Sequence, residues 1–250
     1  LSPDPMWSEL CHTVPTDQPK VLVFRDKTDT KYVKVLSDFP ALPAVTACAH
    51  LQWDTSTQEI ATIFSYAVPA CMNEFQLRGF VDEEGFVRFA LIVHGHHSPY
   101  LPVFRADGQW HHFCVTWQQE NGTWAIYADG KRRASASGLC PVGPSAPQAI
   151  FGQGTFIIGA KESFSGNITD LHIWQKVLSP EHIEKVRSCW LPVLWWGVWL
   201  ASQSRNSQIR WPGEHGEGQK RSVELSLQMG SWAKNKIQLW SLLVLPVLQT

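Results

Sequence analysis

The chain has 250 residues, of which 44% are hydrophobic and 17% charged, so it is too apolar for a disordered polymer. Its 21 lysine and arginine residues nearly balance 22 acidic residues, which argues against the basic surface of a nucleic-acid-binding protein. No apolar run reaches the ~18 residues of a membrane-spanning helix. Pro192 and Pro246 interrupt the two strongest candidates. We therefore expect a globular protein with no nucleic-acid partner and no membrane span in this chain.

Three zones of different composition follow one another along the chain. Residues 1–20 are rich in Pro, Ser, Thr and Asp, which is typical of a linker or arm. Residues 21–189 consist of short runs in which apolar and polar residues alternate. Residues 190–250 contain seven of the 13 tryptophans without a steady period, and we expect this divergent tail to be poorly ordered.

The middle zone predicts β-sheet. Apolar residues alternate with more polar ones over 45–53 and 110–118, which is the period of a half-buried strand. Asp82–Gly85 and Asn121-Gly122 are hairpin signals, and the second predicts a tight turn with positive φ. Further strands are expected near 32–35, 60–68, 75–80, 86–93, 124–128, 150–151, 156–158 and 171–174. Many short strands between regular turns predict an all-β protein, a two-sheet antiparallel jelly-roll sandwich of the lectin-like class.

One short helix is expected near residues 179–189. Ser179 can cap its first turn, Pro180 suits the first helical position, and Glu181 lies at the positive end of the helix dipole. Ile183 and Val186 supply a short apolar stripe for packing.

The segment from His112 to Trp117 reads His-Phe-Cys-Val-Thr-Trp and resembles the pentraxin signature, although Gln119 stands where that signature has Ser or Thr. The surrounding order is also similar, with Tyr127-Ala-Asp-Gly130 after the signature and Val177-Leu-Ser-Pro-Glu181 at the helix. The resemblance covers residues 21–186. The wording of its motifs in sequence most resembles the pentraxin domains of adhesion G-protein-coupled receptors and of long pentraxins. In pentraxins, the chain after this helix forms one more strand pair that contains a Trp. Nothing after Cys189 in this sequence clearly matches that pair. We expect open sheet edges there unless the Trp-rich tail covers them.

Six cysteines allow 15 disulfide connectivities. Cys48 and Cys114 both lie opposite the bulky apolar residues of their strands, and the resemblance implies that they pair; two buried free thiols are the alternative. Pairing of Cys11 with Cys189 would fasten the arm to the end of the helix, and it would leave Cys71 and Cys140 for each other.

The resemblance implies a calcium site in loops on one face of the sandwich, through which pentraxins bind phosphocholine or anionic groups. The site residues that remain are Asn73, Glu74 and Gln153, while Met72 stands where the family has Asp. The loop after Gly152-Gln153 has no carboxylate before Glu162. Because calcium needs six to eight oxygens, we expect a degraded site that binds calcium weakly or not at all.

Asn121 and Asn167 begin N-glycosylation sequons, which together with the even cysteine count favour an extracellular location, secreted or within a receptor ectodomain. We expect a non-enzymatic recognition module for an extracellular protein, glycan or anionic ligand, and the resemblance suggests a homo-oligomer. The alternative is a structural or oligomerisation ectodomain without a small-molecule site. The imidazoles of the His94–His97 run are candidate zinc ligands, but a solvated loop is the simpler expectation.

Overall fold

The computed structural model describes residues 21–24, 31–36, 41–56, 59–69, 71–140, 150–151, 155–159, 164–188, 221–231 and 238–242. The strands are β1 (Leu22–Phe24), β2 (Lys31–Leu36), β3 (Ala41–Leu42), β4 (Ala44–Trp53), β5 (Ala61–Val68), β6 (Cys71–Val81), β7 (Phe86–Val93), β8 (His96–His97), β9 (Leu101–Arg105), β10 (Trp110–Gln118), β11 (Thr123–Ala128), β12 (Lys131–Ala136), β13 (Ile150–Phe151), β14 (Thr155–Ile158), β15 (Gly166–Trp174), β16 (Arg221–Ser231) and β17 (Gln238–Leu242). A short 3-10 turn, η1 (Glu120–Gly122), and one helix at residues 180–188 complete the described elements.

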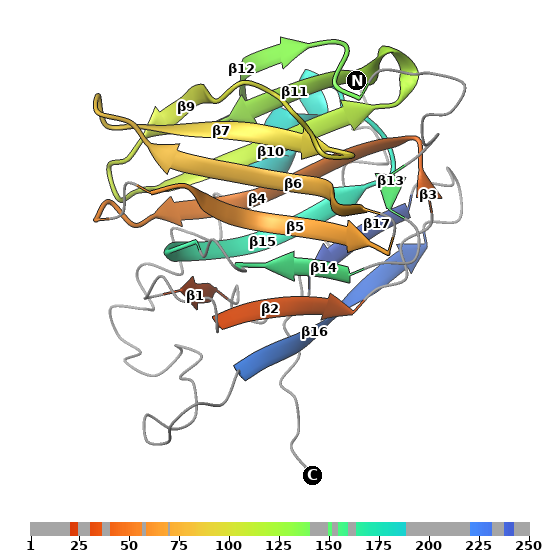
Figure 1. Ribbon diagram of the computed structural model, residues 1–250, viewed down its shortest axis with the longest axis horizontal. Coiled ribbons are helices and arrows are strands. Elements are labelled where there is room, and N and C mark those ends of the chain that lie inside the picture. Colours follow the sequence, from red (N-terminus) through yellow and green to blue (C-terminus); the bar gives the residue numbers. More distant parts are fainter. Residues whose placement is uncertain are drawn as a thin grey trace, which may run out of the picture.

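The strands form two stacked layers, as the sequence predicts. The first sheet has the order β12-β11-β10-β4-β15, with β1 beside part of β15. The second has the order β2-β14-β5-β6-β7-β8, with β9 also paired to β7. Figure 1 shows β5, β6 and β7 of the second sheet lying over β4, β10 and β15 of the first. The small pair β3–β13 lies at one end of the sandwich.

Two strands of the C-terminal segment join the layers along one side. β17 pairs with β15 of the first sheet, and β16 pairs both with β17 and, in parallel, with β2 of the second. The Trp-rich tail therefore does cover edges that would otherwise expose unpaired backbone groups. These two strands lie within the zone expected to be poorly ordered; the rest of that zone lies outside the described residues.

The core lies between the two sheets and is built from the inward residues of the alternating strands. Phe89 on β7 packs edge-to-face against Phe113 on β10 of the other sheet, with ring centroids 5.7 Å apart, and also contacts Trp53 at the end of β4. Phe113, Val115 and Trp117 are buried in this core, and His112 and Cys114 lie on the opposite face of β10, as the alternation predicts.

A second, smaller apolar cluster covers the outer face of the first sheet. Leu178, Ile183 and Val186, from the helix and the segment before it, pack in one group with side chains of the sheet: Cys48, Cys114, Ala125, Tyr127 and Trp174. The predicted cap is present, since the Ser179 hydroxyl accepts the main-chain N–H of His182 at 3.3 Å. The helix is thus fixed directly above the strands that carry the signature residues.

The predicted hairpins form with the expected turn chemistry. Asn121 and Gly122 have φ values of 60° and 56° at the β10–β11 turn. A Cβ atom at Gly122 would lie 2.4 Å from the carbonyl oxygen of Leu139, so only glycine allows this approach. At the β6–β7 turn, the Asp82 carboxylate accepts the main-chain N–H of Phe86 at 2.8 Å.

Candidate functional site

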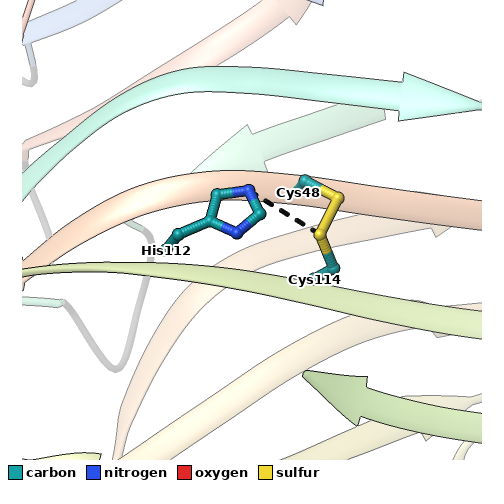
Figure 2. Close-up of side chains that lie close together, drawn as sticks. All are labelled: Cys48, His112 and Cys114. Carbon is teal, nitrogen blue, oxygen red and sulfur yellow. Dashed lines mark hydrogen bonds between the residues drawn. A yellow bond between two sulfur atoms is a disulfide. The ribbon is translucent and has the colours of Figure 1, made fainter. Parts of the chain in front are cut away.

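A cluster of polar side chains lies on the outer face of the first sheet, beside the helix. It contains Cys48 and His50 from β4, His112 and Cys114 from β10, and Asp170 and His172 from β15. Cross-strand register sets Cys48 opposite Cys114 and His50 opposite His112, because side chains two residues apart share a face. In Figure 2 the imidazole of His112 lies beside the disulfide, with Nε2 3.8 Å from Sγ of Cys114.

Three imidazoles and one carboxylate continue this cluster. The rings of His50 and His112 have centroids 4.7 Å apart. Nδ1 of His50 is 3.7 Å from one oxygen of Asp170, and Nε2 of His172 is 2.6 Å from the other. Asp170 reaches this position because it sits at a register shift in β15 and adopts a φ of 57°.

Burial and the contact between Asp170 and His172 together decide the charges in this cluster. It lowers the pKa of His50 well below its usual value and the pKa of His112 to about 4. Burial acts to raise the pKa of Asp170, but the charge and hydrogen bond of His172 lower that pKa to about 2. Burial acts to lower the pKa of His172, and the contact with Asp170 raises it nonetheless. At neutral pH, His50 and His112 are therefore neutral beside an ionised carboxylate.

A second buried pair lies where β6 begins. Glu74, 3% exposed, pairs through its carboxylate with Nδ1 of His94 at 2.7 Å. The main-chain carbonyls of Asn73 and Glu74 accept the N–H groups of Gly95 and His94, each at 2.9 Å. Neighbouring Met72 is 81% exposed. His94 is thus not solvated, contrary to the expectation, because the tight β7–β8 turn directs its ring inward, whereas His96 and His97 of the same run are exposed.

His111 forms a third group, which the sequence did not single out. Its two ring nitrogens lie 2.8 Å from a carboxylate oxygen of Asp129 and 3.1 Å from one of Asp107, and its ring stacks on Phe104. Burial acts to lower the pKa of His111, but the two carboxylates raise it. This imidazole therefore links the β9–β10 loop to the β11–β12 turn.

The cysteines follow the prediction in part. Cys48 and Cys114 form a disulfide with a sequence separation of 66 residues, so the first pairing is confirmed. Cys71, half-buried, and Cys140, buried, are free thiols, so the expected bond between them is not formed. That expectation rested only on elimination among the remaining cysteines. Cys11 and Cys189 lie outside the described residues.

Comparison with known proteins identifies the family. The family model described as the Pentaxin family matches residues 20–196, which is most of the chain. The chain belongs to the pentraxin family. It is 45% identical over 176 residues to human adhesion G protein-coupled receptor D2 and 33% identical over 174 residues to human neuronal pentraxin-1. These matches cover 68% and 67% of this chain.

The pentraxin fold is also found among solved structures. A heptameric SAP-like pentraxin from Limulus polyphemus has a TM-score of 0.60 and 25% sequence identity, over 70% of this chain and 85% of that one. The chain spans only 18% of the adhesion receptor and 39% of neuronal pentraxin-1. Within the part of the chain that the structure describes, no helix is both long enough and apolar enough to cross a membrane.

Pentraxins usually bind calcium, and at the start of β6 several of the candidate oxygens already have other partners. Calcium takes six to eight oxygens, several of them from carboxylates. Here the Glu74 carboxylate is held by His94, both main-chain carbonyls are already hydrogen-bonded, and Met72 has no oxygen to offer beyond the backbone. Gln153, from the second loop of the family site, lies outside the described residues.

The sulfur atoms beside His112 do not make a metal site in the oxidised protein either. Cys48, His112 and Cys114 bring their ligand atoms within 4.8 Å of one another. A metal requires cysteine as thiolate, however, and here the two sulfurs are bonded to each other. The group is best described as a buried disulfide with a neutral imidazole against it.

Proposed function

We propose that this pentraxin domain is a non-enzymatic, extracellular recognition module whose calcium-dependent ligand site is degraded. The observation that carries the proposal is the pairing of Glu74 with His94. A buried carboxylate with one oxygen already held by an imidazole is a poorer calcium ligand, because binding the metal through both oxygens would break that contact. Recognition would then depend on protein, glycan or anionic groups that bind the surface directly.

Two further observations support the extracellular and non-enzymatic parts. A fully buried disulfide that joins Cys48 to Cys114 of the signature is typical of an oxidising compartment. The acidic run at Asp82 serves its hairpin, since Asp82 accepts the N–H groups of Glu84 and Phe86 and pairs with Arg88. Its carboxylate is therefore engaged in structure and is not presented as one of a pair of catalytic acids.

Calcium titration by calorimetry on the full chain tests the proposal. We expect no saturable heat below millimolar calcium, and the same resistance to proteolysis with calcium as with a chelator. The variant Met72→Asp returns the acidic oxygen of the family's Asp-Asn pair, so any gain in affinity over the unaltered chain locates residual binding at the start of β6. Saturable binding in the micromolar range by the unaltered chain would refute the degraded-site proposal.

The alternative function is a structural or oligomerisation ectodomain. It is favoured by the 45% identity to an adhesion receptor of which this chain spans only 18%. Light scattering on the purified chain would show whether it assembles, as the Limulus relative does in its heptamer. Deleting the domain from a parent receptor separates the two functions. Loss of assembly or surface delivery with unchanged ligand capture would favour the structural one.

A further inference from the structure

The two sequons lie in opposite environments. Asn121 and Thr123 are both exposed, at the β10–β11 turn. The main chain of this turn is fixed, because the carbonyl of Asn121 accepts the N–H of Gly138 at 2.8 Å and that of Gly122 accepts the N–H of Leu139 at 3.1 Å. The first sequon thus presents its side chains to solvent from a rigid backbone.

The second sequon is built into the first sheet. Asn167 lies on β15 opposite Gln52 of β4, and its side-chain N–H donates to Oε1 of Gln52 at 2.6 Å. Gln52 in turn donates to the carbonyl of Gly108 at 2.7 Å. Ile168 and Thr169, the other two sequon residues, are 1% and 4% exposed. A transferase would have to reach this segment before the strand pairs.

We propose that Asn121 carries an N-linked oligosaccharide and that Asn167 does not. In the transfer, Nδ2 of Asn121 bonds to the anomeric carbon of a lipid-pyrophosphate-linked oligosaccharide. The bond from that carbon to the pyrophosphate oxygen breaks, the lipid pyrophosphate leaves, and one amide proton passes to a base of the transferase. No oxidant or reductant is involved. The modification rests on the extracellular location proposed above, because this chemistry belongs to the secretory route.

The position of Asn121 also gives the sugar a role. β12 is the outermost described strand of the first sheet, and Ala134 is its only buried residue. Charged side chains protect one end of this edge at Lys131, Arg132 and Arg133, since charges on an edge strand oppose pairing with another chain. The other end, at Ser135 and Ala136, is neutral and exposed.

The sequon lies at this neutral end. Ala136 pairs with Trp124, which directly follows the sequon, and Gly138 and Leu139 just beyond β12 are bonded to the Asn121 turn. Figure 1 shows β12 at the rim of the sandwich beside β11. An oligosaccharide on Asn121 therefore shields the part of the edge that has no charge, and it limits self-association through strand pairing.

The test expresses the full chain behind a heterologous secretion signal, so that its native route does not affect the result. We expect peptide-N-glycosidase to remove one oligosaccharide mass from the unaltered chain and from Asn167→Gln, and none from Asn121→Gln or Thr123→Ala. Sedimentation of the same four proteins should show a several-fold rise in self-association only in the last two. Closure of the Cys48–Cys114 disulfide, read by thiol labelling, confirms that each variant has folded.

Two results would overturn the proposal. Sugar retained by Asn121→Gln and lost from Asn167→Gln would reverse the assignment of the site. Loss of the sugar without any rise in self-association would remove the shielding role. Neither result bears on the calcium titration, and tight calcium binding by the glycosylated chain would defeat the proposed function while leaving this site intact.

Discussion

His112 sits between a disulfide and a second imidazole, and this position keeps it neutral. It is 3% exposed, and its pKa of about 4 lies well below the 6.5 of a free imidazole. An unfolded chain therefore binds a proton at His112 between pH 6.5 and 4 that the folded chain does not bind. Stability supplied by the neutral form is present above pH 6.5 and is lost as the pH falls toward 4.

The variant His112→Asn tests this linkage. At about 1.36 kcal/mol per pKa unit, His112 should lower the free energy of unfolding by about 3 kcal/mol between pH 6.5 and 4, and the variant should lose that share of the acid sensitivity. Urea unfolding at several pH values measures it, with His97→Asn, an exposed histidine, as the control. If the free energy of unfolding of His112→Asn fell with decreasing pH as steeply as that of the unaltered chain, the prediction would be contradicted.

The disulfide should contribute strongly to stability. Joining Cys48 to Cys114 closes a loop with a sequence separation of 66 residues, which is worth about 4 kcal/mol by the loss of unfolded-chain entropy. The double variant Cys48→Ala/Cys114→Ala should lower the free energy of unfolding by about that amount in urea. Cys71→Ala, which removes a free thiol, is the control. A loss no greater than that of the control would show that the bond does not stabilise the protein.

At this same scale, alternation placed each cysteine opposite the bulky apolar residues of its strand, and the resemblance to pentraxins implied that Cys48 pairs with Cys114. The sequence did not predict the partners of Glu74 and Asp170. Glu74 contacts His94, which is 20 residues later in the sequence and directly after the neighbouring strand of the β6–β7 pair. Asp170 reaches His50 and His172 only through a register shift in β15, and such shifts have no reliable local pattern in the sequence.

Among the elements, the helix at residues 180–188 begins with a side-chain cap from Ser179. Ser179 accepts the N–H of His182, and its hydrogen bond to Glu181 lowers the pKa of that carboxyl. Ser179→Ala should cost about 1 kcal/mol, while Ser179→Asp should keep most of the stability. Hydrogen exchange at the Ile183 amide and thermal unfolding measure the effect, with the exposed Ser135→Ala as the control. Equal exchange in the Ala and Asp variants would argue against the cap.

The elements themselves could mostly be predicted from the sequence. The hairpins at Asp82–Gly85 and Asn121-Gly122, the alternating strands and the capped helix all have signals within a few residues. The strands β3, β8, β9 and β12 are not among the predicted ones; β3 and β8 have only two residues each, too few to establish a period. The parallel pairing of β16 with β2 is also invisible locally, because its partners lie at opposite ends of the chain.

For the molecule as a whole, Phe89 joins the two sheets. It is fully buried and packs against Phe113 of the opposite sheet and Phe104 of β9. Phe89→Ala should lower the free energy of unfolding by about 3–5 kcal/mol, because it leaves a cavity at this junction. Met72→Ala, at a side chain 81% exposed, should change it by under about 0.5 kcal/mol. If urea unfolding showed that Phe89→Ala and Met72→Ala lower the free energy of unfolding equally, the centre of the core would lie elsewhere.

The sandwich architecture followed from the number and spacing of predicted strands, but strand order did not. β4 lies between β10 and β15, which come much later in the chain. Alternation tells which face of a strand is buried and says nothing about which neighbour it pairs with. The closing strands β16 and β17 come from the zone whose sequence least resembles the family, so the resemblance also gave no guidance there.

The central place of β4 has a consequence during synthesis. Its first partner, β10, leaves the ribosome only after the intervening hairpins, and Cys48 waits for a cysteine 66 residues further on. At about 5–20 residues per second this wait is roughly 3–13 s. The Cys48 thiol, on a still unpaired β4, thus stays without its partner for seconds, which is long enough for an oxidoreductase to react with it.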